Sequence, residues 1–69
     1  MKDNKSLYEL IEEYVGLRDT CYQSDIIKAF SGEYSKQYIK QTCYRLWEDA
    51  KIFRLKKVGS TYLVTIWRH

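Results

Sequence analysis

The spacing of apolar residues changes once along this chain, near residue 52. Before that point apolar residues recur every three or four positions, which is the period of a helix buried on one face. From Phe53 they alternate with charged residues, and 61–67 is then almost wholly β-branched or aromatic, as strands prefer. The sequence contains no proline to interrupt these elements. The pattern predicts an α+β domain in which helices are followed by a C-terminal β-hairpin.

The first helix is predicted to begin after Ser6. Ser6 and Glu9 form the pattern of a capping box, in which each side chain bonds the other residue's backbone N–H. Gly16 is a natural stop, because glycine tolerates a left-handed cap. We expect a connector over 17–23 that can hold a short strand at Thr20–Tyr22. The apolar stripe of this helix is Leu7, Leu10, Ile11, Tyr14 and Val15.

Two further helices are predicted. Ser24 is the expected N-cap of a short helix over roughly 25–31, and Gly32 is its expected C-cap. Tyr34 is the expected apolar plug of the turn that follows, and Ser35 is the expected N-cap of the third helix. The apolar face of that third helix is Ile39, Cys43, Leu46, Trp47 and Ala50.

The hairpin is predicted to turn at Gly59-Ser60 through a type II′ loop. With regular pairing, Val58 lies opposite Thr61, Leu55 opposite Val64 and Phe53 opposite Ile66. The face expected to cover the helices then holds Phe53, Leu55, Tyr62, Val64 and Ile66, and the other face holds Arg54, Lys56, Leu63, Thr65 and Trp67.

The 69 residues are expected to form one domain, 1–69, with 1–5 as an N-terminal tail. No apolar run is long enough to span a bilayer or to serve as a signal peptide, so we expect a cytoplasmic protein with no membrane partner. Charge is divided unevenly. Residues 1–33 carry four Lys or Arg and seven Asp or Glu, whereas 34–69 carry eight and two. A basic half that amounts to +6 suggests a polyanion as partner, most often nucleic acid, although a solvated surface is the alternative.

Catalytic chemistry is the weakest interpretation of this sequence. Cys21 and Cys43 are expected to be core residues in a reducing compartment, although a single disulfide stays open as an alternative. The one histidine, His69, is the last residue, and no metal-ligand cluster, acid–base pair or phosphate loop accompanies it. We therefore expect no enzyme activity, no cofactor, no metal and no small-molecule ligand.

The order of elements resembles a winged helix-turn-helix domain over nearly the whole chain. SDIIKAFSGEYSKQYIKQTCYRLWEDAKIFRL resembles the family's helix, turn and recognition helix, and KIFRLKKVGSTYLVTI resembles its two-stranded wing. Two features depart from the family pattern. Gly32-Glu33-Tyr34-Ser35 replaces the compact turn of many members, and Asp49-Ala50-Lys51 lacks the glycine often found before the wing.

The resemblance implies that the third helix enters the major groove of DNA and that the wing touches the backbone or the minor groove. Gln37 and Gln41 suit adenine, Lys36 or Lys40 suits guanine or phosphate, and Arg45 suits phosphate. The DNA-binding residues expected on the helix are Ser35, Lys36, Gln37, Lys40, Gln41, Tyr44 and Arg45, and those expected on the wing are Arg54, Lys56, Lys57 and Ser60.

The leading functional hypothesis is a small, sequence-specific regulator of transcription, a repressor that binds double-stranded DNA as a homodimer and comes from a virus, phage or plasmid. One alternative is a winged-helix protein-interaction module that inhibits a host machine, with the first helix or Trp67 as its contact. Another is an architectural or replication-associated DNA binder. The lysines at 56 and 57 have an alternative role too, since charge on a hairpin protects an edge strand from aggregation.

Overall fold

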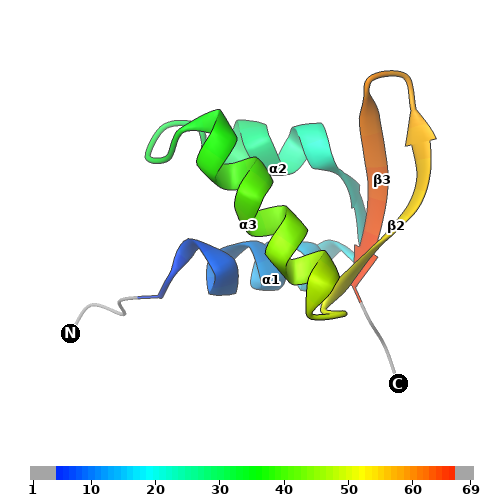
Figure 1. The fold of residues 1–69 in the computed structure, drawn as a ribbon, viewed down its shortest axis with the longest axis horizontal. Helices are drawn as coiled ribbons and strands as arrows, with labels where there is room; N and C mark the ends of the chain where they lie inside the picture. The colour runs from blue at the N-terminus through cyan, green and yellow to red at the C-terminus, as the bar shows by residue number, and fades with distance from the viewer. Residues whose placement is uncertain (1–4, 67–69) are drawn as a thin grey trace.

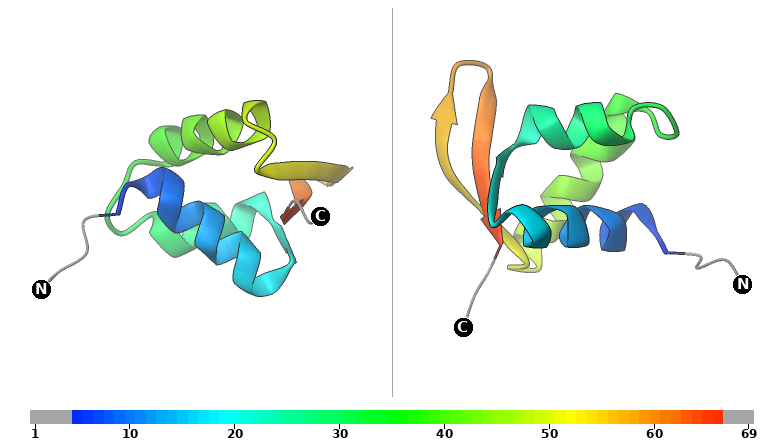
Figure 2. Two further views of the ribbon diagram at one scale, coloured as in Figure 1. Left: turned by 90° about the horizontal axis from the view of Figure 1, so that it is seen from below. Right: turned by 180° about the vertical axis from the view of Figure 1, so that it is seen from behind.

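The computed structural model describes residues 5–66 as three helices packed on one side of a three-stranded antiparallel sheet (Figures 1 and 2). The strand order is β1-β3-β2. The predicted α+β class, the three helices, the C-terminal hairpin and the short strand are confirmed, and the layout is that expected of a winged helix. The elements are α1 (Leu7–Arg18), β1 (Thr20–Tyr22), α2 (Gln23–Phe30), α3 (Lys36–Glu48), β2 (Ile52–Val58) and β3 (Thr61–Ile66).

Two of the predicted helix caps are confirmed. The Glu9 N–H donates to Ser6 Oγ at 3.3 Å and the Ser6 N–H donates to Glu9 Oε1 at 3.2 Å, which completes the capping box of α1. At α3, the Tyr38 N–H donates to Ser35 Oγ at 3.1 Å. The predicted stop at Gly16 is wrong, because α1 continues to Arg18 and Asp19 takes a positive φ of 65°. Asp19 then joins the sheet, since its carbonyl accepts from Thr65 Oγ1 at 2.8 Å.

The predicted caps of α2 are wrong. The helix begins two residues earlier than predicted, at Gln23, and the Asp25 carboxylate accepts from the Tyr22 N–H at 3.4 Å. Ser24 lies inside the first turn, and its N–H donates to Thr61 Oγ1 of the hairpin at 3.0 Å. At the other end Ser31, not Gly32, is the C-cap. A contact with a distant strand therefore replaces the local cap that the sequence suggests.

One hydrophobic core lies between the helices and the sheet. Tyr34 packs against its edge, as expected of the plug in the turn, and Trp47 packs against it from α3. Cys21 and Cys43 are free thiols inside this core, and burial raises the pKa of Cys21 to about 11 and that of Cys43 to about 12. The buried apolar residues are Leu7, Ile11, Val15, Cys21, Ile26, Ile39, Cys43, Leu46, Ile52 and Val64.

The hairpin departs from the predicted register at a β-bulge. Val58 lies opposite Thr61 as expected, but Arg54, not Leu55, lies opposite Val64, and the pairing shifts between Arg54 and Lys56. The predicted pairs Leu55–Val64 and Phe53–Ile66 are therefore wrong, since Phe53 lies opposite Thr65.

The bulge also changes which side chains cover the helices. Leu55 is 55% exposed rather than buried, and Ile52 supplies the buried side chain of β2 instead. Arg54 moves to the side of the sheet that carries Val64. The expectation for Trp67 lies outside the described residues.

Ala50 is predicted in the apolar face of α3, but the helix ends at Glu48 and Ala50 is exposed with φ of 59°. A left-handed conformation is unfavourable for a residue with a Cβ, by about 1–2 kcal/mol. Ala50→Gly relieves that cost but gives the unfolded chain more freedom, about 0.4–1 kcal/mol. We expect a net stabilisation of about 0.5–1 kcal/mol in urea unfolding. The matched control Ala29→Gly, inside α2, should instead destabilise by about 0.5–1 kcal/mol. If both substitutions change the free energy of unfolding equally, Ala50 does not have the positive φ described above.

Helices α1 and α3 are also joined by a hydrogen bond from the Tyr8 hydroxyl to the Asp49 carboxylate. This bond is the main reason why the pKa of Tyr8 is raised to about 12 from an ordinary value near 10. The bond favours neutral Tyr8, so its contribution to stability is fully present below pH 10 and is lost as the pH rises towards 12. Stability measured between pH 9 and pH 12 should fall less steeply in Tyr8→Phe than in the parent. Parallel curves would contradict a role for this bond.

Candidate nucleic-acid interface

The exposed arc of α3 carries two parallel rows of polar side chains. Residues four apart lie nearly above one another on a helix, and neighbouring residues are separated by about 100°. Lys36, Lys40 and Tyr44 form the lysine row, and Gln37 and Gln41 form the glutamine row. All five side chains are exposed. The opposite side of the helix is buried by Ile39, Cys43 and Leu46, which fixes the direction in which both rows face.

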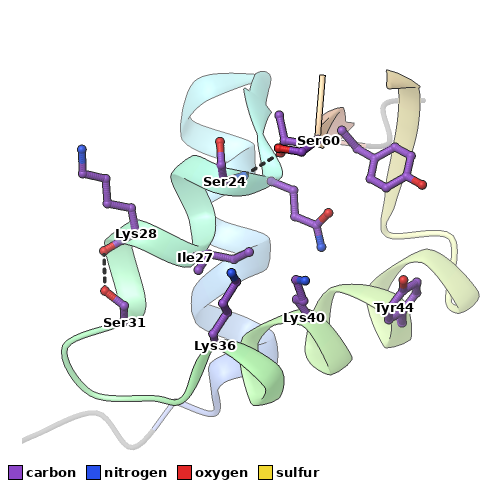
Figure 3. Close-up of a pocket in the computed structure, with 11 residues that line it drawn as sticks. Ser24, Ile27, Lys28, Ser31, Lys36, Lys40, Tyr44 and Ser60 are labelled. Atoms are coloured by element: carbon purple, nitrogen blue, oxygen red, sulfur yellow. Dashed lines mark hydrogen bonds between the residues drawn. The ribbon is translucent and has the colours of Figure 1, made fainter. Parts of the chain in front are cut away.

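The lysine row forms one wall of a recess between α3, α2 and the hairpin loop. Figure 3 shows Lys36 and Lys40 on the side of α3 that faces the other two elements. The recess has a volume of about 320 Å³ and is lined by Gln23, Ser24, Ile27, Lys28, Ser31, Lys36, Lys40, Tyr44, Ser60, Thr61 and Tyr62.

No carboxylate lines this recess, whereas three lysines do. The acidic residues of 5–33 lie elsewhere. Glu9, Glu12 and Glu13 are on α1, where Lys5 pairs with Glu13, and Asp25 binds the backbone at the start of α2. The recess is therefore a concentrated positive site in a protein whose net charge is only +3.

The hairpin loop is held over the recess by two local features. The hydrogen bond from the Ser24 N–H to Thr61 Oγ1 ties the start of α2 to the start of β3. A type II′ turn requires a positive φ at its first central residue and a negative φ at its second. Gly59 has a φ of 63°, and the φ of Ser60 is not positive, so the loop meets this requirement. Ser60 is thereby placed at the rim of the recess, opposite Lys36 and Lys40.

The remaining wing residues are divided between the two sides of the hairpin. The Arg54 guanidinium lies 4.3 Å from the centre of the Trp47 ring and 4.9 Å from that of Tyr62, so it packs at the base of the hairpin. Lys57 lies on the same side, with its ammonium 6.0 Å from the Tyr62 ring. Lys56 lies opposite Leu63 and faces away from the helices. Lys57 thus lies closer to the recess than Lys56.

Arg45 lies on the other flank of α3, next to α1. It lines a second recess of about 480 Å³ together with Ser6, Tyr8, Tyr38, Thr42 and Asp49. Thr42 is buried, and its hydroxyl is satisfied by donating to the Tyr38 carbonyl at 2.8 Å. The Ser35 hydroxyl is already engaged as the cap of α3.

The structure thus places the predicted site residues in distinct positions. All eleven are exposed, and the recess brings together Lys36, Lys40, Tyr44 and Ser60. The other seven lie outside that lining: Ser35, Gln37, Gln41, Arg45, Arg54, Lys56 and Lys57. Sequence reasoning missed Lys28 and Ser31 of α2. The sequence contains a pattern that could have indicated them. Ser24, Lys28 and Ser31 follow the spacing i, i+4, i+7 and form one polar stripe on a short helix.

Among residues 5–66 no group of three or more His, Cys, Asp or Glu side chains is placed to hold a metal ion. No helix in the same range is long and apolar enough to cross a bilayer.

The chain was compared with known proteins. No protein-family model, no curated protein and no solved structure matches it.

Proposed function

We propose that this protein binds double-stranded DNA as a winged helix-turn-helix domain, with α3 in the major groove and the hairpin loop against the sugar–phosphate backbone. The observation that carries the proposal is the gathering of the lysine row, Lys28 and Ser60 into one surface without a carboxylate in its lining. A major groove about 12 Å wide admits one helix, and phosphate contacts with lysines supply most of the affinity.

The glutamine row supports sequence recognition within the same proposal. Gln37 and Gln41 are exposed, and a glutamine amide can both donate to and accept from an adenine edge. A single helix reads few base pairs, so pairing of two copies on a two-fold symmetric site would supply further specificity. We therefore extend the proposal to a homodimeric regulator that represses transcription by occupying its DNA site.

The proposal is tested by the salt dependence of DNA binding. Fluorescence anisotropy with a labelled random-sequence duplex at 50 and 200 mM salt should show binding that weakens steeply as salt increases. Selection from a random library should then yield a preferred motif. Absence of binding at 50 mM salt, where attraction to phosphates is strong, would falsify the proposal.

Gln41→Ala separates base reading from backbone binding. We expect the variant to lose preference at one position of the selected motif, by about 1–3 kcal/mol, because a bidentate base contact contributes that much discrimination. Its affinity for random-sequence DNA should stay unchanged. The measurement is competition between the selected motif and single-base variants, and equal discrimination by parent and variant would show that Gln41 reads no base.

One observation favours a second candidate function, a protein-interaction module. Tyr22, Leu55 and Val58 are exposed on strands β1 and β2. Tyr22 lies opposite Leu63 and Val58 opposite Thr61, on the sheet face turned away from the buried Val64. Leu55→Ser should abolish the binding of a protein partner at this surface, whereas DNA binding through α3 should be unaffected. Retained duplex binding by Leu55→Ser would separate the two functions.

A further inference from the structure

We infer that the recess between α2, α3 and the hairpin loop binds one phosphate of the DNA backbone, and that Lys36 and Lys40 read no bases. This inference rests on the proposed function and deepens it, because it assigns each row of α3 to one chemical part of the DNA. Lysine next to a major groove can donate either to guanine or to phosphate. The position of the recess favours phosphate.

The first reason is the direction in which the two rows face. When a helix lies in the major groove, base edges lie along the centre of the groove and the two phosphate backbones run along its sides. The lysine row is turned towards α2 and the hairpin loop, at one edge of the exposed arc of α3. The glutamine row lies about 100° further round, nearer the middle of that arc. A helix that presents Gln37 and Gln41 to the bases therefore presents Lys36 and Lys40 to a flanking backbone.

The second reason is the chemistry of the lining. Lysine ammonium groups act as compact positive charges with three donors each, and they suit phosphate oxygens. Ser60 adds a hydroxyl donor from the hairpin loop, and Tyr44 adds one from α3 (Figure 3). Lys28 lines the recess from α2, with its side chain pointing away from Lys36 and Lys40. No carboxylate in the lining competes for these donors.

The third reason is that the recess is built from three separate elements that are fixed relative to one another. The bond between the Ser24 N–H and Thr61 Oγ1 joins α2 to the hairpin, and Ile26 and Ile39 anchor α2 and α3 in the common core. Lys36 and Lys40 therefore face a preformed concavity of about 320 Å³ instead of projecting from an open surface. Such a volume accommodates a phosphate together with its adjoining sugar.

The test replaces single phosphates of a bound duplex by neutral methylphosphonates, one position at a time. In the parent protein, neutralising the phosphate that occupies the recess should weaken binding about tenfold, since a charge-assisted contact is lost. In Lys36→Gln/Lys40→Gln the same replacement should change affinity less than about twofold, because both lysines that face this phosphate have been removed. Gln41→Ala is the matched control in the adjoining row, and it should keep the full tenfold loss. Circular dichroism checks that each variant is folded.

The outcomes separate this inference from the proposed function. Suppose that the parent binds the duplex, but every methylphosphonate weakens binding by the lysine variant as much as binding by the parent. That result would overturn the inference and leave DNA binding intact. If the parent binds no duplex, a titration with inorganic phosphate against chloride at equal ionic strength, followed by NMR, decides the matter. Saturable shifts at Lys36, Lys40 and Ser60 that disappear in Lys36→Gln would uphold an anion site without DNA binding, and unchanged spectra would overturn it.

Discussion

Lys36→Gln/Lys40→Gln should bind duplex DNA about a hundredfold more weakly than the parent at 50 mM salt, and should remain folded. Both side chains are exposed, so their removal leaves the core intact. Because the two lysines face one phosphate, the loss of that contact should also reduce the salt slope by about 0.9. Anisotropy titrations across a range of salt concentrations measure both quantities.

The control for this prediction removes the same charge elsewhere. Lys5 lies before α1, where it pairs with Glu13, and Lys51 follows α3. Neither residue lines the recess. Lys5→Gln/Lys51→Gln should weaken binding less than about threefold. If both double variants weaken binding equally, net charge alone governs the affinity and the recess has no special role.

Leu46→Ala should unfold the domain at room temperature or bring it close to unfolding. Leu46 is 0% exposed, and truncation of a buried leucine costs about 2–5 kcal/mol. A domain of this size has a free energy of unfolding of about 3–10 kcal/mol, so the loss is a large share of the total. Chemical denaturation followed by circular dichroism measures the change.

Leu17→Ala is the matched control for Leu46→Ala. The substitution is identical and the site is again helical, but Leu17 is 84% exposed. Its effect on the free energy of unfolding should stay within about 0.5 kcal/mol. A loss at Leu17 that equals the loss at Leu46 would show that Leu17 is buried in solution, in the monomer or between copies.

The parts of the fold that depend on local sequence could be predicted. The caps at Ser6 and Ser35 are satisfied by backbone groups three residues away, and the buried side of α3 follows the spacing of Ile39, Cys43 and Leu46. The loop at Gly59 could be predicted because its φ of 63° favours glycine. Such features depend on residues that are close together in the chain, so a sequence pattern is enough to predict them.

The parts that depend on distant contacts could not be predicted. A bulge at Leu55 shifts the pairing by one residue and reverses the face of Leu55, because the side-chain period of a strand is two. Likewise, the start of α2 depends on Thr61, which accepts the Ser24 N–H from another element. Ala50 adopts a positive φ where glycine is the usual residue, so its residue type alone suggested a continuing helix.

The candidate site shows the same division. The exposed rows of α3 follow from helical spacing, and the predicted residues on them are exposed as expected. Lys28 joins the recess only because α2 packs beside α3 and the hairpin, which the sequence does not specify. Lys56 and Lys57 lie on opposite sides of the hairpin, as the alternation of a strand predicts from the Val58–Thr61 pair.

The most direct test of DNA binding through α3 and the hairpin loop is an NMR titration of the labelled protein with a bound duplex. Amide and side-chain shifts should concentrate at Gln37, Lys40, Gln41 and Ser60, while Glu12 on α1 stays unchanged. Shifts confined to α1 or to the outer face of the sheet, or no shifts at low salt, would contradict this binding mode.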